Sequence, residues 1–112
     1  MPYLSIISNQ VLDTDSNQLN LLSKIVAKGL NKPESYVMVS IQHNPDMLFA
    51  GKKEPLAFCE LKSLGLQISQ TAELSNSLCT CLNKLYGIST KRIYIEFSAP
   101  ARSMWGWNTK TF

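Results

Sequence analysis

Proline at position 2 is the first residue of the sequence whose type and place could do chemistry. An initiator methionine is normally removed before a small residue, and loss of Met1 would leave the secondary amine of Pro2 as the N-terminus. A free α-amino group has a pKa of about 7.7–8.0, which burial or a nearby cation lowers, and an amine that titrates near neutral pH can act as a general base. A Met-Pro start also occurs in proteins that make no use of their N-terminus. If Met1 stays, the nitrogen of Pro2 is an amide without a basic lone pair.

The thiols and the imidazole are weaker candidates for catalysis or metal binding. Cys59, Cys79 and Cys81 form no CxxC pair, and His43 is the only histidine. A zinc ion held by these residues would need ligands from distant segments, so we expect no metal site. Free thiols fit a reducing compartment. A nucleophilic site built on His43 finds no supporting partner in the sequence.

The composition limits the chain to one globular domain. Its 112 residues are 45% apolar and 17% charged, which is enough for a single core and too little for two. The net charge of +3 is spread along the chain, with basic pairs only at 52–53 and 91–92, which argues against nucleic-acid binding. The first residues carry no basic n-region, so we expect no signal peptide, and no apolar stretch approaches the ~18 residues of a membrane span. We therefore expect a cytoplasmic protein without a membrane partner.

Alternating apolar residues predict four strands that would position the candidate functional residues. The predicted strands are residues 3–9, 36–42, 56–64 and 92–97. In the second of them Val37, Val39 and Ile41 share one face, and in the last Ile93, Ile95 and Phe97 do. The opposite face is too apolar in places to be left in water, so we expect it to be buried in an oligomer.

Two helices are predicted from apolar stripes of helical period. The first stripe runs from Leu19 to Leu30 and ends at Asn31 with Pro33, and the second runs over 74–85 before Gly87. The candidate N-caps are Asp13, Asp15 or Ser16 for the first helix and Ser69 or Thr71 for the second.

The two halves of the chain match at a constant offset. A shift of 56 residues pairs Leu22 with Leu78 and Val37 with Ile93, across helix, loop and strand. The sequence therefore predicts one domain over residues 1–112, made of two pseudo-repeats at about 2–55 and 56–112. Two unrelated β-α-β segments of similar length could also align this well. The expected fold class is α+β: a duplicated β-α-β unit that forms a four-stranded mixed sheet with two helices on one face.

Five motifs in order resemble the macrophage migration inhibitory factor family of the tautomerase superfamily. They are Met1-Pro2-Tyr3-Leu4, Asn31-Lys32-Pro33, Leu61-Lys62-Ser63-Leu64-Gly65, Arg92-Ile93-Tyr94-Ile95, and Gly106-Trp107-Asn108 with Phe112. The resemblance runs from end to end. It implies a homotrimer with active sites between subunits, and keto–enol tautomerisation of α-keto acids such as phenylpyruvate, without a metal or other cofactor.

The resemblance also assigns roles to particular residues. Pro2 matches the catalytic base, and Lys32 matches the lysine that binds the substrate carboxylate and helps to keep the proline neutral. A lysine at the end of a helix is also favourable on dipole grounds alone. The other substrate-binding positions that the resemblance implies are Leu64, Ser63, Tyr36, Trp107, Phe112, and Tyr94 from the adjacent subunit. For each aromatic residue, ordinary core or interface packing is the alternative.

Some residues depart from the family pattern. Glu96 stands where the vertebrate cytokine has asparagine, and it would repel an anionic substrate or pair with Lys32. Lys62 replaces a histidine, and Trp105 replaces a small residue near the pocket. The family's CxxC has only Cys59 here, so we expect no thiol-oxidoreductase activity. The alternative function is a cytokine-like signalling or binding trimer with vestigial catalysis, which would engage a protein receptor and leave the cell without a signal peptide.

Overall fold

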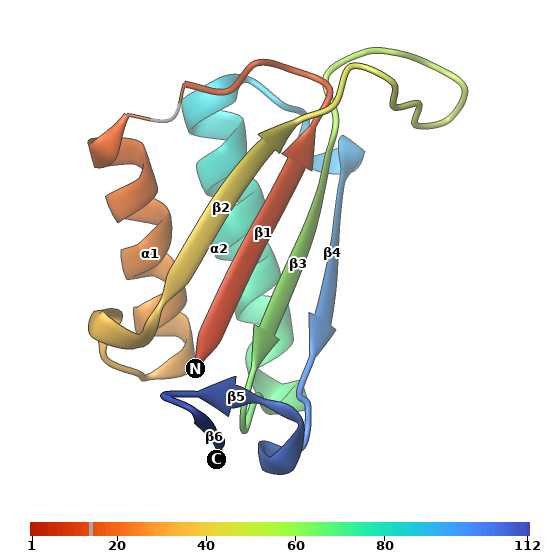
Figure 1. Ribbon diagram of the computed structural model, residues 1–112. Coiled ribbons are helices and arrows are strands. Elements are labelled where there is room, and N and C mark those ends of the chain that lie inside the picture. The colour runs from red at the N-terminus through yellow and green to blue at the C-terminus, as the bar shows by residue number, and fades with distance from the viewer. Residues whose placement is uncertain (14) are drawn as a thin grey trace.

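The computed structural model describes residues 1–13 and 15–112, and within them a four-stranded sheet carries two α-helices on one face (Figure 1). The main elements are β1 (Pro2–Ser8), α1 (Ser16–Leu30), β2 (Met38–His43), β3 (Ala57–Ser63), α2 (Ile68–Tyr86) and β4 (Ile93–Ser98). A C-terminal hairpin of β5 (Gly106–Trp107) and β6 (Lys110–Thr111) follows. Short 3-10 turns are η1 (Glu34–Tyr36), η2 (Thr90–Arg92) and η3 (Arg102–Met104).

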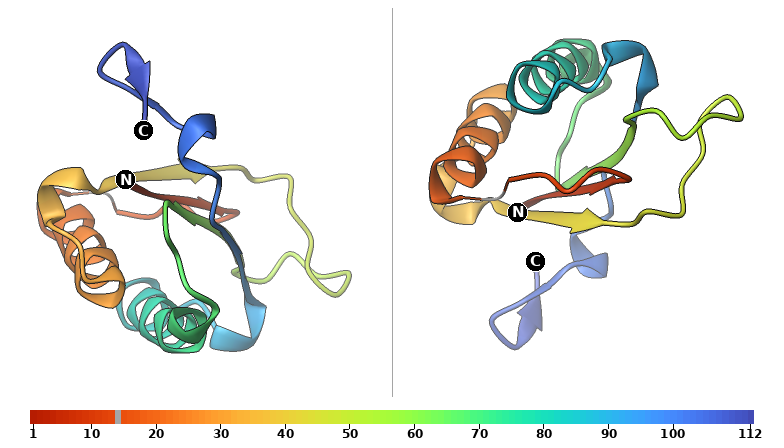
Figure 2. Two further views of the ribbon diagram at one scale, coloured as in Figure 1. Left: turned by 90° about the horizontal axis from the view of Figure 1, so that it is seen from below. Right: turned by 90° about the horizontal axis from the view of Figure 1, so that it is seen from above.

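The strand order shows how two β-α-β units make one sheet. The order is β2-β1-β3-β4, in which β1 and β2 are parallel, β3 and β4 are parallel, and the central pair β1 and β3 is antiparallel. Each parallel pair is joined through its own helix, and both helices lie on the same side of the sheet (Figure 2). The hairpin lies on the other side (Figure 2). The predicted α+β arrangement is therefore confirmed.

The core lies between the sheet and the helices, because strand alternation and helical stripes direct the same residue types there. In β1 and β3 every second residue is buried, among them Leu4, Ile6, Cys59 and Leu61. The helices contribute Leu22, Val26, Leu30, Leu74, Leu78 and Leu82. The predicted inward face of β2 and β4, with Val39 and Ile95, packs against this cluster.

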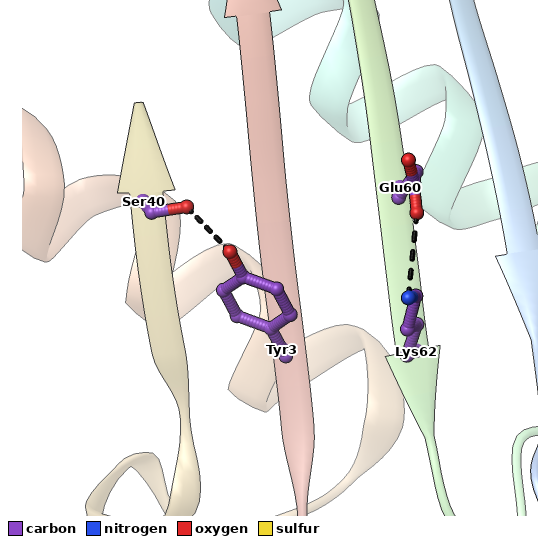
Figure 3. A network of polar contacts seen from close by, with 4 residues as sticks. All are labelled: Tyr3, Ser40, Glu60 and Lys62. Atoms are coloured by element: carbon purple, nitrogen blue, oxygen red, sulfur yellow. Dashed lines mark hydrogen bonds and ion pairs between the residues drawn. The ribbon is translucent and has the colours of Figure 1, made fainter. Parts of the chain in front are cut away.

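The opposite sheet face is not covered by helices and carries large side chains. Met38 is 67% exposed and Tyr94 is 64% exposed. Tyr3 lies between Met38 and Lys62 in the strand register, and its hydroxyl is hydrogen-bonded to Ser40 at 2.7 Å (Figure 3).

Within the described residues, neither helix combines the length and apolar character needed to cross a membrane.

The helix starts confirm one predicted cap and correct another. Asp15 caps α1, since its side chain accepts a hydrogen bond from the Gln18 amide at 3.0 Å; the Ser16 side chain is outside the described residues. The cap of α2 is neither Ser69 nor Thr71. Gln67 and Gln70 form a capping box instead, in which long amide side chains reach the backbone groups that short ones usually satisfy.

The second and last strands begin later than predicted. Tyr36 belongs to η1 rather than to a strand, because Pro33, at φ −61, starts a 3-10 turn that delays β2 until Met38. Arg92 is the last residue of η2, a turn that Ser89 caps, and β4 begins directly after it at Ile93. This change of conformation takes Tyr36 out of the sheet and brings it beside the N-terminus.

Candidate active site

The site is built around the first residues of β1. Pro2 pairs with Ser63 across β3, and its ring is buried. Met1 precedes it in this chain, so the Pro2 nitrogen is an amide until Met1 is removed. Because β1 lies in the centre of the sheet, the packing of both helices holds the position of this N-terminus.

A cleft of about 510 Å³ opens at this end of the sheet. This volume lies within the range of sites for small molecules. Pro2 contributes from β1, Tyr36 from η1 and Trp107 from the C-terminal hairpin, so segments from both ends of the chain meet here. The lining residues are Met1, Pro2, Tyr3, Ser35, Tyr36, Val37, Met38, Trp105, Gly106 and Trp107.

Positive charge reaches the N-terminus from the end of α1. Burial, and after it the charge of Lys32, lowers the pKa of the Met1 amino group below its ordinary value of 8.0. Lys32 follows Asn31, whose left-handed conformation (φ 54) ends the helix, and the Lys32 amide donates to the carbonyl of Ala27 at 2.9 Å. Lys32 itself lines a neighbouring hollow at the end of α1 rather than the aromatic cleft.

Ser63 and Leu64 lie next to Pro2 but are enclosed by protein. Ser63 is fully buried, and its hydroxyl donates to the carbonyl of Leu64 at 3.3 Å. Leu64 is 6% exposed. Neither side chain lines the cleft, so the contact that this segment could offer a ligand is a main-chain one.

Phe112 and Tyr94 differ in their relation to the cleft. Phe112 stacks on Trp107, with ring centroids 5.7 Å apart and an interplanar angle of 12°, so it contacts a cleft residue without lining the cleft itself. Tyr94 lies at the opposite end of the sheet: it is in register with Phe58, which pairs with Ile7, five residues along β1 from Pro2. At about 3.3 Å per residue this separation is roughly 17 Å. Tyr94 therefore cannot join Pro2 within one chain.

The residues that depart from the family pattern occupy defined places. Trp105 lines the cleft. Lys62 lies on the uncovered sheet face, where its ammonium is 3.5 Å from the carboxylate of Glu60 (Figure 3). Glu96 is directly opposite Glu60 in the β3–β4 register.

The cleft also contains residues that sequence reasoning missed, namely Tyr3, Ser35, Val37 and Met38. Tyr3 and Met38 are cross-strand partners in the β1–β2 pair. The alternation of each strand places its side chain on the uncovered face, but only the register brings the two together. This register was the missing signal.

Among residues 1–13 and 15–112, no group of three or more His, Cys, Asp or Glu side chains could hold a metal ion. Burial raises the pKa of the Cys59 thiol to about 12, so this sulfur is protonated and unreactive at neutral pH.

The whole length of the chain is similar to known proteins. The family model "Macrophage migration inhibitory factor (MIF)" matches residues 1–112. A macrophage migration inhibitory factor homolog of Brugia malayi is 37% identical over 117 residues, which covers 100% of this chain and 99% of the relative.

Solved structures of similar proteins have the same fold. The macrophage migration inhibitory factor homologue from Prochlorococcus marinus superimposes with a TM-score of 0.92 at 39% identity, covering 98% of both chains. The protein from Trichinella spiralis gives a TM-score of 0.91 at 34% identity, covering 98% of this chain and 99% of that one. With its two helices packed on a four-stranded mixed sheet and matches that run from end to end, this chain belongs to the macrophage migration inhibitory factor family, of the tautomerase superfamily.

Proposed function

We propose that the protein is a keto–enol tautomerase for phenylpyruvate-type α-keto acids, with Pro2 as general acid/base once Met1 has been removed. The observation that supports this most strongly is the placement of Pro2 at an aromatic cleft within reach of the charge of Lys32. The reaction needs one group that takes a proton and returns it, and no cofactor. Pro2 removes a proton from the carbon beside the ketone, a carbon–carbon double bond forms, and the proton goes to the carbonyl oxygen.

The environment of the N-terminus favours the neutral amine that this step requires. Burial and the Lys32 cation already lower the pKa of the amino group of Met1. After removal of Met1 the new amine is one residue deeper in the chain, at the buried Pro2. Both effects then act on a secondary amine, so a larger fraction of it is the free base at neutral pH.

Lys32 is the proposed anchor for the substrate carboxylate. A cation beside the base attracts an anionic substrate and disfavours protonation of the amine, so both assigned roles have one electrostatic cause. The aromatic rings of Tyr36 and Trp107 line the cleft and suit the phenyl group of the substrate. Lys32 lines the neighbouring hollow, so the substrate carboxylate would extend from the cleft toward it. Phe112 holds the Trp107 ring, and Ser63 holds the Leu64 peptide that would contact the substrate.

The proposed assembly is a homotrimer with active sites between subunits. Because Tyr94 is far from Pro2 along the sheet of its own chain, it can reach a Pro2 pocket only if that pocket belongs to a neighbouring subunit. The exposed Met38 and Tyr94 on the uncovered sheet face support burial of that face against other copies. Sedimentation should give about three times the chain mass of 12.5 kDa. A stable monomer would remove Tyr94 from the site.

A second candidate is a cytokine-like binding trimer with weak or vestigial catalysis, acting on a protein receptor. The presence of Trp105 in the cleft favours it, because a large indole narrows the space for a substrate. The exposed carboxylate of Glu96 adds negative charge that would repel an α-keto acid. The proposed location is the cytoplasm, with export that needs no signal peptide in the case of the receptor role.

The test is conversion between the enol and keto forms of phenylpyruvate, followed by ultraviolet absorbance. The protein should have an intact mass that shows removal of Met1, and Pro2→Gly serves as the matched variant. Conversion above the uncatalysed rate that is lost in Pro2→Gly supports the tautomerase. Absence of conversion in the processed wild-type protein would refute it and favour the binding role.

A further inference from the structure

Arg92 holds the long segment that joins β2 to β3, residues 44–56, which projects beyond the sheet (Figure 1, Figure 2). The guanidinium donates hydrogen bonds to main-chain carbonyls along this segment. The acceptors are Phe49 (from Nη1, 3.0 Å), Lys52 and Glu54 (from Nη2, 3.0 and 3.1 Å) and Pro55 (from Nε, 3.0 Å). The planar fork of arginine can reach several acceptors at once, which the single ammonium of a lysine cannot reproduce.

This segment depends on polar anchors because it contributes little to the core. Within residues 44–55 only Met47 and Phe49 are even partly buried. Asn9 provides the second anchor: its side chain donates to the carbonyls of Lys53 and Glu54 and accepts from the amide of Leu56. Asn9 therefore fixes the end of the segment near β3, whereas Arg92 also reaches its tip at Phe49.

The tip of the segment contacts Tyr94. Phe49 and Lys52 exchange main-chain hydrogen bonds of 3.1 Å around a tight turn. The guanidinium carbon of Arg92 lies 5.2 Å from the centre of the Phe49 ring, a cation–π contact. The same ring also contacts Tyr94, at a centroid distance of 4.7 Å and an interplanar angle of 47°. Because Tyr94 is 64% exposed, the contact with Phe49 is an important constraint on its ring.

We infer that Arg92 is a positioning residue for Tyr94. By binding the carbonyls of segment 44–56 it fixes the Phe49 ring, and the Phe49 ring sets the direction in which the Tyr94 side chain leaves the sheet. This inference rests on the proposed function, in which Tyr94 enters the substrate pocket of a neighbouring subunit. In this proposal Arg92 itself does not touch the substrate. It is the last residue of η2 and precedes Tyr94 of β4 by two positions.

Kinetics with phenylpyruvate test the positioning role. Arg92→Gln removes the fork and one positive charge, and Lys91→Gln removes a charge from the exposed neighbouring residue without touching segment 44–56. We expect Arg92→Gln to raise KM by about 3- to 10-fold, the scale of one misplaced hydrogen bond, with Lys91→Gln within twofold of wild type. Arg92→Lys should resemble Arg92→Gln. Full activity in Arg92→Lys would show that charge alone suffices and would overturn the inference.

A double-mutant cycle separates positioning from general loosening of the fold. If Arg92 acts through Tyr94, then Arg92→Gln has no further effect on KM in a Tyr94→Ala background. Equal effects of Arg92→Gln in the two backgrounds would overturn the inference. Phe49→Leu, which keeps the main-chain acceptors and removes the ring, gives the same test if Arg92→Gln fails to fold.

Fluorine NMR tests whether Arg92 positions the Tyr94 ring, and it does so independently of catalysis. Protein labelled with 3-fluorotyrosine should show a Tyr94 fluorine resonance, assigned by its loss in Tyr94→Phe, that shifts or broadens in Arg92→Gln and Phe49→Leu but not in Lys91→Gln. An unchanged resonance in both variants would overturn the inference. Inactive wild-type protein would instead refute the proposed function, while the resonance would still report whether Arg92 orders the ring.

Discussion

Replacement of Lys32 by glutamine should weaken substrate binding far more than it weakens the fold. Lys32 lies just beyond the C-terminal end of α1, and its charge acts on the N-terminal amine. Glutamine keeps much of the side-chain length and removes the charge. Lys28→Gln is the matched control, because Lys28 is an exposed lysine in the last turn of the same helix.

The expected rise in KM and the expected loss of fold stability differ enough to be told apart. Loss of a hydrogen bond between a cation and a carboxylate costs about 1.5–3 kcal/mol, which corresponds to a rise in KM of roughly 10- to 150-fold. The fold loses only the favourable interaction of a cation with the helix dipole, at most about 1 kcal/mol, because the main-chain bond from Lys32 to Ala27 at 2.9 Å remains. The melting temperature should therefore fall by no more than about 4 °C.

The pH dependence of kcat/KM gives a second test of the role of the Lys32 charge. The cation of Lys32 disfavours protonation of the amine, so its removal raises the pKa of the amine. The acidic limb of the kcat/KM profile should move to higher pH in Lys32→Gln and stay in place in Lys28→Gln. An unchanged KM and an unchanged acidic limb in Lys32→Gln would refute the assignment of Lys32 to the site.

Further predictions concern the helix contact, the sheet face and the buried thiol. Gly29→Ala should lower stability by about 1–3 kcal/mol in denaturant unfolding, because a Cβ at Gly29 would lie 2.3 Å from Cδ2 of the buried Leu74; unchanged stability would mean that Leu74 can move. Glu96→Gln should raise stability by a few tenths of a kcal/mol, by removing a like charge opposite Glu60, and should lower KM for phenylpyruvate; a higher KM would contradict the repulsion argument. Cys59, with its pKa raised to about 12, should react with a disulfide reagent at pH 8 only after unfolding, as a labelled-peptide mass would show, and rapid labelling of the native protein would contradict its burial.

The sequence predicts the layers of the fold well because each layer has its own hydrophobic period. The alternation in β1 and the stripe of α2 both direct residues such as Leu4 and Leu78 into one core. The ends of elements are less predictable. The N-cap of α2 is Gln67, whose backbone amide donates to the side-chain oxygen of Gln70, whereas propensity rules favour a nearby serine or threonine as the cap.

The site could be predicted only in part, because the sequence does not give the register. Pro2, Tyr36 and Trp107, which the family resemblance assigned, do line one cleft. Met38 reaches the same cleft through its pairing with Tyr3, which depends on the alignment of β1 and β2. Tyr94 shows the opposite case: its sequence motif marks it as a site residue, and the strand register places it at the far end of the sheet from Pro2.

The central claim is that the amine of Pro2 is the base, and the presence or absence of Met1 tests it within one sequence. Two preparations, one that retains Met1 and one that lacks it by intact mass, should be compared for phenylpyruvate enol–keto conversion at the same protein concentration. The form without Met1 should be active, and the form with Met1 should be slower by at least about 100-fold, the contribution of a general base, because its Pro2 nitrogen is an amide. Equal rates in the two forms would contradict the account.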